Sequence, residues 1–201
     1  MPHYRDEAVV IRTHKLGEVD RIVTLLTKNH GQVRAVAKGV RKTSSRIGAR
    51  LEPFNVVDLQ LYEGRNLDTV SQVEQLANYG SVIVADYARY TAASAVVEAA
   101  ERFTREDSSS QHYMLVIGAL RALSLKEHSS DQILDSYLLR ALAISGWITN
   151  LDQCQGCAST ETVSFSVHSG SVSCQSCTMP GSVRLGVDGI SHISALLIGD
   201  W

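Results

Sequence analysis

Apolar and polar residues alternate with a period of two over much of the first 80 positions of the chain. Between Val57 and Tyr62, for example, every second residue is apolar. This alternation is typical of strands that bury one face. It predicts five strands, at Glu7–Arg12, Arg21–Thr27, Gln32–Lys38, Asn55–Tyr62 and Leu67–Val73. Residues 28–31 and 63–66 contain the asparagine and glycine that turns favour, so we expect each to join two strands.

After Gly80 the apolar residues recur with the period of a helix. Ser129 and Gln132 have the spacing of a capping box, and Gly146 is suited to end the same helix. Another helix is expected to begin near Asp188. The apolar stripes are Ile83, Tyr87, Tyr90, Val97 and Phe103; Tyr113, Val116, Ile117, Leu120 and Leu123; Leu134, Tyr137, Leu138 and Leu142; and Ile190, Ile193 and Leu197. We interpret these stripes as core faces.

These two patterns predict an α+β protein with two domains. Five short strands in fewer than 80 residues fit a small β-barrel over residues 1–79. An OB-fold and an SH3-like barrel both suit this pattern, which does not separate them. An α-helical domain is expected over residues 80–201, with a cysteine-rich insertion at residues 150–182.

All four cysteines of the chain fall in that insertion. Cys154 and Cys157 form one Cys-x-x-Cys pair, and Cys174 and Cys177 form a second pair after 16 intervening residues. Each pair can turn two thiolates toward one point, and two pairs complete the tetrahedral sulfur set that zinc prefers. The segments 162–167 and 171–173 are expected to pair as a small ribbon that brings the two Cys-x-x-Cys knuckles together. Free thiols and a redox dithiol are the alternatives, although a redox dithiol favours a βαβ context that is absent here.

A zinc ion with four thiolate ligands is structural, because a catalytic zinc keeps one position for water. The sharpest enzymatic alternative, a zinc deaminase, needs a His-x-Glu motif that the sequence lacks. Metalloprotease, P-loop and nucleophile-elbow motifs are also missing from the sequence. The prediction is therefore a protein that is not an enzyme.

Charge is distributed unevenly along the chain, although its formal net value is only −2. Residues 1–50 carry a formal charge of +7 and residues 51–201 a formal charge of −9. From Arg21 to Leu51 there are eight basic residues and no acidic one. Arg34 and Lys38 are expected on one face of a strand, with the later cations on a mobile loop after it. Such a surface suits phosphates, and RNA, single-stranded DNA and acidic proteins all remain open as partners.

No apolar run approaches the roughly 20 residues of a membrane helix. The first residues also lack the apolar segment of a secretory signal. A cytoplasmic protein without membrane contact is therefore expected, and in that compartment paired cysteines bind metal more often than they form disulfides.

Sequence blocks along nearly the whole chain resemble the RecO family of bacterial recombination mediators, in the family's order. They are Ala8–Arg12, Gly17–Val23, Leu26–Thr27, Gly31, Ala37–Lys42, Ser45–Arg46, Leu51–Phe54, Leu138–Arg140, Gly146, Leu151, Cys154 with Cys157, Ser164–Ser166, and Gly170 with Cys174 and Cys177. The stretch Tyr62–Asp68 resembles the actinobacterial branch. Two departures are Ser169 before Gly170, where the family often has two glycines, and the continuation of most members beyond the position of Trp201.

The resemblance implies an N-terminal OB-fold, a helical domain and a zinc finger. It also implies binding of single- and double-stranded DNA, annealing of complementary strands, and help in loading RecA on DNA coated with single-stranded DNA-binding protein (SSB). The implied partners are the C-terminal tail of SSB and RecR, in the nucleoid region of the cytoplasm. The implied DNA contacts are Arg34, Lys38, Arg41, Lys42, Arg46 and Arg50.

Two other functions remain open alongside this one. The first is an RNA-binding or ribosome-associated barrel with a zinc ribbon, which would prefer RNA to DNA of equal length. The second is a protein adaptor whose basic loop binds an acidic partner and no nucleic acid. In a gel shift, such an adaptor would not retard nucleic acid.

Overall fold

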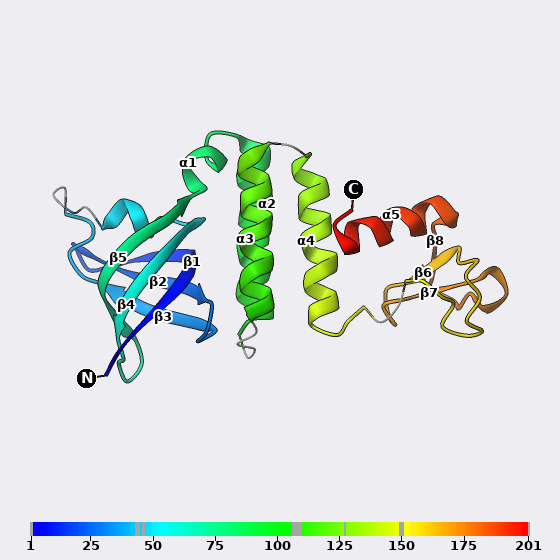
Figure 1. Cartoon of the computed structure of the whole chain (residues 1–201), viewed down its shortest axis with the longest axis horizontal. Coiled ribbons are helices and arrows are strands. Elements are labelled where there is room, and N and C mark those ends of the chain that lie inside the picture. Colours follow the sequence, from blue (N-terminus) through cyan, green and yellow to red (C-terminus); the bar gives the residue numbers. More distant parts are fainter. Residues whose placement is uncertain are drawn as a thin grey trace. The chain divides into compact units, whose positions relative to one another are not determined.

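The computed structural model describes residues 2–42, 45, 47–105, 110–126, 128–148 and 151–200 (Figure 1). The chain divides into two compact units, Met1–Leu134 and Asp135–Trp201, which are described separately below. The domain boundary expected at residues 79/80 separates strands from helices. The two compact units meet further along the chain, at residues 134/135, because the first helices pack on the barrel.

The first unit is built on a five-stranded barrel. Its strands are β1 (His3–Leu16), β2 (Asp20–Thr27), β3 (Gln32–Ala37), β4 (Asn55–Tyr62) and β5 (Asp68–Asn78). They pair in the order β1-β2-β3-β5-β4, and β4 pairs again with β1, so every strand has two neighbours. Only the β3–β5 pair is parallel. This arrangement confirms the predicted OB-fold architecture.

Alternation along the strands fills the barrel with aliphatic side chains, as the period-two pattern predicts. The interior residues are Ala8, Val10, Val23, Leu25, Ala35, Ala37, Val40, Leu51, Val57, Leu59, Leu61 and Val73. The strand β1 is longer than predicted at both ends, and a register shift between Val10 and Arg12 marks a β-bulge. Strands bend and twist at such bulges. The end of β1 beyond the bulge is largely exposed, so it lacks the alternation by which the rest was recognised.

Helices cover one outer side of the barrel. The helices of this unit are α1 (Gly80–Ile83), α2 (Tyr87–Phe103) and α3 (Ser110–Leu125), with a short 3-10 helix η1 (Gly48–Leu51) before β4. Val9, Leu26 and Val56 are paired across β2, β1 and β4 and point out of the barrel. All three are nevertheless buried. The helices α2 and α3 pack against β1, so they bury this row. Asp86 caps α2 by accepting a hydrogen bond from the backbone N–H of Arg89 at 3.1 Å.

The helix α4 (Ser130–Ile144) leads into the second unit. Ser129 accepts a hydrogen bond from the backbone N–H of Gln132 at 3.2 Å, which confirms the predicted N-cap. At the other end Gly146 has a φ of 78°, and the N–H of Trp147 bonds to the carbonyl of Leu142 at 2.9 Å. This is the Schellman pattern that the glycine predicts.

The remainder of the second unit is a small sheet packed on a helix. The sheet contains β6 (Ser164–Ser166), β7 (Ser171–Ser173) and β8 (Val183–Arg184) in the order β7-β6-β8, with a 3-10 helix η2 (Gln175–Cys177) between β7 and β8. The predicted ribbon is therefore confirmed as β6 and β7. The predicted last helix is α5 (Gly186–Ile198). Leu151, Val172 and Ile190 form the shared core. Within the described residues, no helix is long and apolar enough to cross a membrane.

Candidate metal centre and nucleic-acid interface

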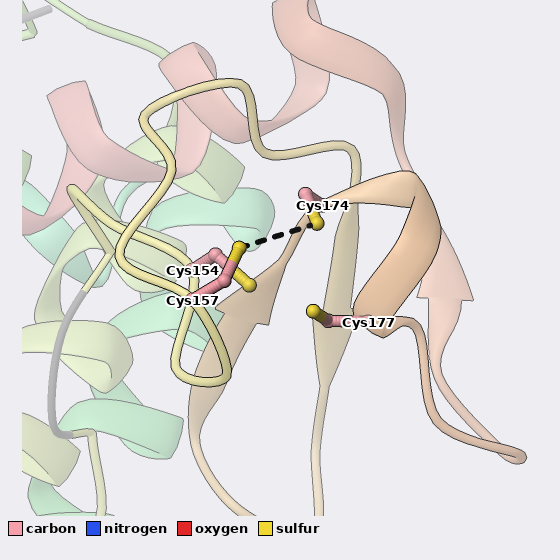
Figure 2. Close-up of side chains that lie close together, drawn as sticks. All are labelled: Cys154, Cys157, Cys174 and Cys177. Atoms are coloured by element: carbon pink, nitrogen blue, oxygen red, sulfur yellow. Dashed lines mark hydrogen bonds between the residues drawn. The ribbon is translucent and has the colours of Figure 1, made fainter.

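The structure brings the four predicted cysteines together at one end of the β6–β7 ribbon (Figure 2). Their Sγ atoms all lie within 4.8 Å of one another, and those of Cys157 and Cys174 are 3.7 Å apart. A tetrahedron with metal–sulfur bonds of about 2.3 Å has edges of about 3.8 Å. The four sulfurs therefore fit a single metal ion.

Local backbone geometry turns each cysteine pair toward this point. The N–H of Cys154 bonds to the carbonyl of Ser159, and the N–H of Ala158 bonds back to the carbonyl of Cys154, both at 2.8 Å. The second pair is closed by the η2 turn, in which the N–H of Cys177 bonds to the carbonyl of Cys174 at 3.2 Å. Gln155 joins the two halves, because its N–H bonds to the carbonyl of Val172 in β7 at 3.1 Å.

Gly156 makes the close approach of the two pairs possible. A Cβ atom at this position would lie 3.1 Å from Sγ and 3.2 Å from Cβ of Cys177. These contacts are tighter than side chains normally make, so a larger residue would push the two knuckles apart. A glycine inside the first knuckle thus supports the same metal geometry as the sulfur distances.

Electrostatics within the cluster favour a bound cation. Backbone N–H groups, first that of Cys174 and then those of Gly156 and Cys157, lower the pKa of Cys154 to about 6. The neighbouring thiol of Cys174, followed by those of Cys157 and Cys154, raises the pKa of Cys177 to about 12. Four thiolates this close repel one another, and a divalent cation removes the repulsion because metal-bound thiols are deprotonated.

Of the predicted nucleic-acid contacts, Arg34 lies on β3, and Lys38, Arg41 and Lys42 follow it in the turn after the strand. Arg34 and Lys38 are both exposed, on the side opposite the buried Ala35 and Ala37. Lys42 is exposed too, and its aliphatic carbons lie over Gly39, 3.8 Å from where a Cβ atom there would be. Within the described part of the chain, none of these three cations has an ion-pair partner.

Arg41 and Arg50 do not belong to a mobile arm, which corrects the prediction for these two residues. The guanidinium of Arg41 donates to the carbonyl of Gly17 at 3.0 Å, and its backbone N–H donates to the carbonyl of Val19. Arg50 lies in η1 and donates to the carbonyl of Val73 in β5 at 2.7 Å. Charge counting along the sequence does not detect such carbonyl partners. The predicted contact Arg46 lies outside the described residues.

Two other cations of the basic stretch are neutralised by carboxylates. Arg21 pairs with Glu52 at 2.6 Å, and Lys28 pairs with Glu7 at 3.3 Å. Both acids lie outside the basic stretch in sequence but beside it in the barrel. Among the described cations of the basic stretch, Arg34, Lys38 and Lys42 are therefore those held by neither a carboxylate nor a backbone carbonyl.

A row of side chains that sequence reasoning missed crosses the same face. His14, Ile22, Val36 and Thr69 lie in register on β1, β2, β3 and β5. Ile22 and Val36 are only partly buried, and His14 is exposed. The two apolar members of this row, Ile22 and Val36, lie in register with each other, and Val36 on β3 stands between Arg34 and Lys38, so the row offers nucleobases a contact surface beside cations that suit phosphates.

Two family models together match almost the whole chain. The model of the recombination protein O N-terminal domain matches residues 1–79, and that of its C-terminal domain matches residues 84–201. The chain belongs to the recombination protein O (RecO) family.

Curated relatives of similar length agree with this assignment. A DNA repair protein RecO from a Nocardioides species is 49% identical over 98% of this chain and 84% of its own length. Those from Streptomyces griseus and Cutibacterium acnes are 48% and 49% identical over the whole of this chain and 85% of their own. Membership of the RecO family gives the chain a role in DNA repair and recombination.

Proposed function

We propose that this chain is a recombination mediator that binds single- and double-stranded DNA and anneals complementary strands. It also helps to load RecA on DNA coated with SSB, and it works with RecR and the C-terminal tail of SSB. The observation that supports this proposal is the barrel face on which Arg34, Lys38 and Lys42, without ion-pair partners among the described residues, lie beside the partly exposed side chains of Ile22 and Val36. We refer to these three cations and the row of His14, Ile22, Val36 and Thr69 as the β3 face.

Phosphates of a single strand bind the cations of the β3 face, and the bases rest on Ile22 and Val36. Neutralised strands repel each other less, so complementary bases can meet. No bond is made or broken, and no nucleotide is hydrolysed. The protein is therefore a binding protein rather than an enzyme, acting in the cytoplasm at the nucleoid.

The four-cysteine centre holds a structural zinc ion in this proposal. Four sulfur ligands favour zinc over harder cations and leave no position for a reactive water. The centre lies directly on the core of Leu151, Val172 and Ile190. Metal binding is therefore expected to stabilise the second unit rather than to take part in DNA contact.

The proposal is tested by annealing of two complementary DNA strands coated with their own SSB, at two salt concentrations. The wild type should accelerate annealing, and higher salt should reduce the acceleration. Exchange of Arg34, Lys38 and Lys42 to Ala should abolish most of the effect. A matched variant removes three exposed cations elsewhere, Arg121, Lys126 and Arg184, and should anneal normally. No acceleration by the wild type on coated or bare strands would refute the mediator function.

An RNA-binding function rests on the same β3 face and is the second candidate. The sparse aromatics on this face favour backbone contacts over base readout, which DNA and RNA both permit. Binding of DNA and RNA strands of equal length and sequence separates the two. Tighter binding to RNA would favour the second candidate.

A further inference from the structure

A cleft of about 680 Å³ lies between the barrel and the helices α1 and α2. Its walls are the middle of β1, the segment from η1 to the start of β4, and the facing residues of α1 and α2. All of these belong to the first compact unit. None of the residues of the β3 face lines the cleft, so it is a separate site.

One wall of the cleft is aromatic. The rings of Phe54 and Tyr90 meet edge to face, with their centroids 6.0 Å apart. Phe54 has a φ of 72°, which a bulky side chain rarely adopts, and its N–H bonds to the carbonyl of Val10 at 3.0 Å. Tyr90 is 47% exposed and Val84 beside the cleft is 60% exposed. Phe54 itself is buried, so Tyr90 and Val84 provide the surface that an occupant can contact.

The polar groups of the cleft are mainly acceptors. Glu52 and Glu98 line it from the barrel side and the helix side, with side chains 49% and 55% exposed. Asn55 lines it as well, and its Nδ2 donates to the carbonyls of Ala49 and Arg50, which fixes the orientation of the amide. The buried Oδ1 of Asn55 therefore faces away from these carbonyls and has no donor among the described residues.

The positive charge of the lining is already neutralised. Arg12 is the single cation among the described residues that line the cleft, and it pairs with Glu101 at 2.7 Å. The partners of the two lining carboxylates, Arg21 and Arg102, lie outside the lining. The Arg102–Glu98 pair is exposed on one helix face, and such pairs are weak and easily exchanged.

We infer that this cleft binds an arginine or lysine side chain, flanked by apolar residues, in a segment of a partner protein. Carboxylates on opposite sides attract the cation, and the ring of Tyr90 offers a cation–π contact. The exposed side chain of Val84 and the ring edge of Tyr90 contact the flanking apolar side chains. A polyanion or an acidic peptide would have to separate Arg12 from Glu101 to find a cation in the lining, whereas a cation needs only to replace the exposed Arg102 at Glu98, so the cation is the favoured occupant.

The test uses the full chain and a fluorescein-labelled peptide with blocked ends, in which one arginine stands between leucine and phenylalanine residues. A second peptide carries glutamate in place of the arginine. Fluorescence anisotropy should show saturable binding of the arginine peptide and at least about tenfold weaker binding of the glutamate peptide. Lys38→Ala and Lys42→Ala should leave the affinity unchanged, because these residues are not in the cleft.

Substitution of the lining carboxylates tests whether the peptide binds in the cleft. Glu52→Gln and Glu98→Gln should each weaken binding by about three- to tenfold. Arg102→Ala should leave it unchanged or strengthen it, because Glu98 is then released to the peptide. Glu161→Gln removes an exposed carboxylate of the second unit and should have no effect. Equal affinity for both peptides, equal losses with Glu161→Gln and Glu98→Gln, or no saturation up to about 1 mM would overturn the inference.

Discussion

The salt dependence of DNA binding should distinguish the cations that are free to bind phosphate from those that donate hydrogen bonds within the barrel. Arg34, Lys38 and Lys42 are exposed and have no ion-pair partner in the described part of the chain. Each phosphate contact contributes about 0.7 to the slope of log K against log salt for a single strand. Exchange of all three residues to Ala should therefore lower the slope by about 2. Between 50 and 200 mM salt, the wild type should lose about 16-fold more affinity than this variant.

Arg50→Ala provides the contrast within the same basic stretch. Its guanidinium donates to the carbonyl of Val73 at 2.7 Å, so the side chain is held against the barrel and is less free to reach a phosphate. Loss of this charge-assisted hydrogen bond should reduce the free energy of unfolding by about 1.5–3 kcal/mol. The salt slope should change by much less than for Lys38→Ala. Arg41→Ala is expected to behave similarly, because Arg41 is held by the carbonyl of Gly17.

Fluorescence anisotropy of a labelled single strand at five or more salt concentrations gives the slope, and urea unfolding gives the stability. The opposite result would be a slope lowered as much by Arg50→Ala as by Lys38→Ala, with an unchanged urea midpoint. That outcome would mean that the carbonyl contact does not restrain Arg50 and that charge counting along the sequence was sufficient.

Three further changes test the structural account. Asp6→Ala should cost about 3 kcal/mol in urea unfolding, because the buried carboxylate accepts from both nitrogens of Asn29 and pairs with His30 at 2.6 Å; an unchanged midpoint would contradict this. Gly156→Ala should release the metal, expected at about one zinc per chain, at a lower chelator concentration. Burial raises the pKa of Tyr137, whose hydroxyl has no hydrogen bond among the described residues. The neutral form is thus favoured in the fold, so stability should fall as pH rises above about 10, and less steeply in Tyr137→Phe.

The interior of the barrel was predictable because strands with one buried face have an apolar residue at every second position. Val57, Leu59 and Leu61 all point into the core, and β4 has the predicted bounds. The clustering of the four cysteines was predictable for a different local reason, because each Cys-x-x-Cys spacing is that of a single turn that brings two sulfurs together. Neither prediction required knowledge of distant contacts.

Features on the barrel surface were less predictable, for physical reasons that differ from residue to residue. The end of β1 beyond Arg12 is exposed on both sides, so no alternation marks it. The role of Arg50 depends on a carbonyl 23 residues away, which a count of charges ignores. Ile22 and Val36 appear in the sequence as ordinary strand residues, and only the register of β2 with β3 places them side by side on the outer face.

The most direct test of the central claim is lysine footprinting, in which acetylation of each lysine is compared with and without bound single-stranded DNA. The chain has five lysines, and two of them, Lys38 and Lys42, belong to the β3 face. Lys28, at the opposite end of β3, and Lys126, after α3, are internal controls. If single-stranded DNA lies on the β3 face, it should protect Lys38 and Lys42 and leave Lys28 and Lys126 reactive. Protection of Lys28 or Lys126 with Lys38 and Lys42 unchanged would contradict this placement of the DNA.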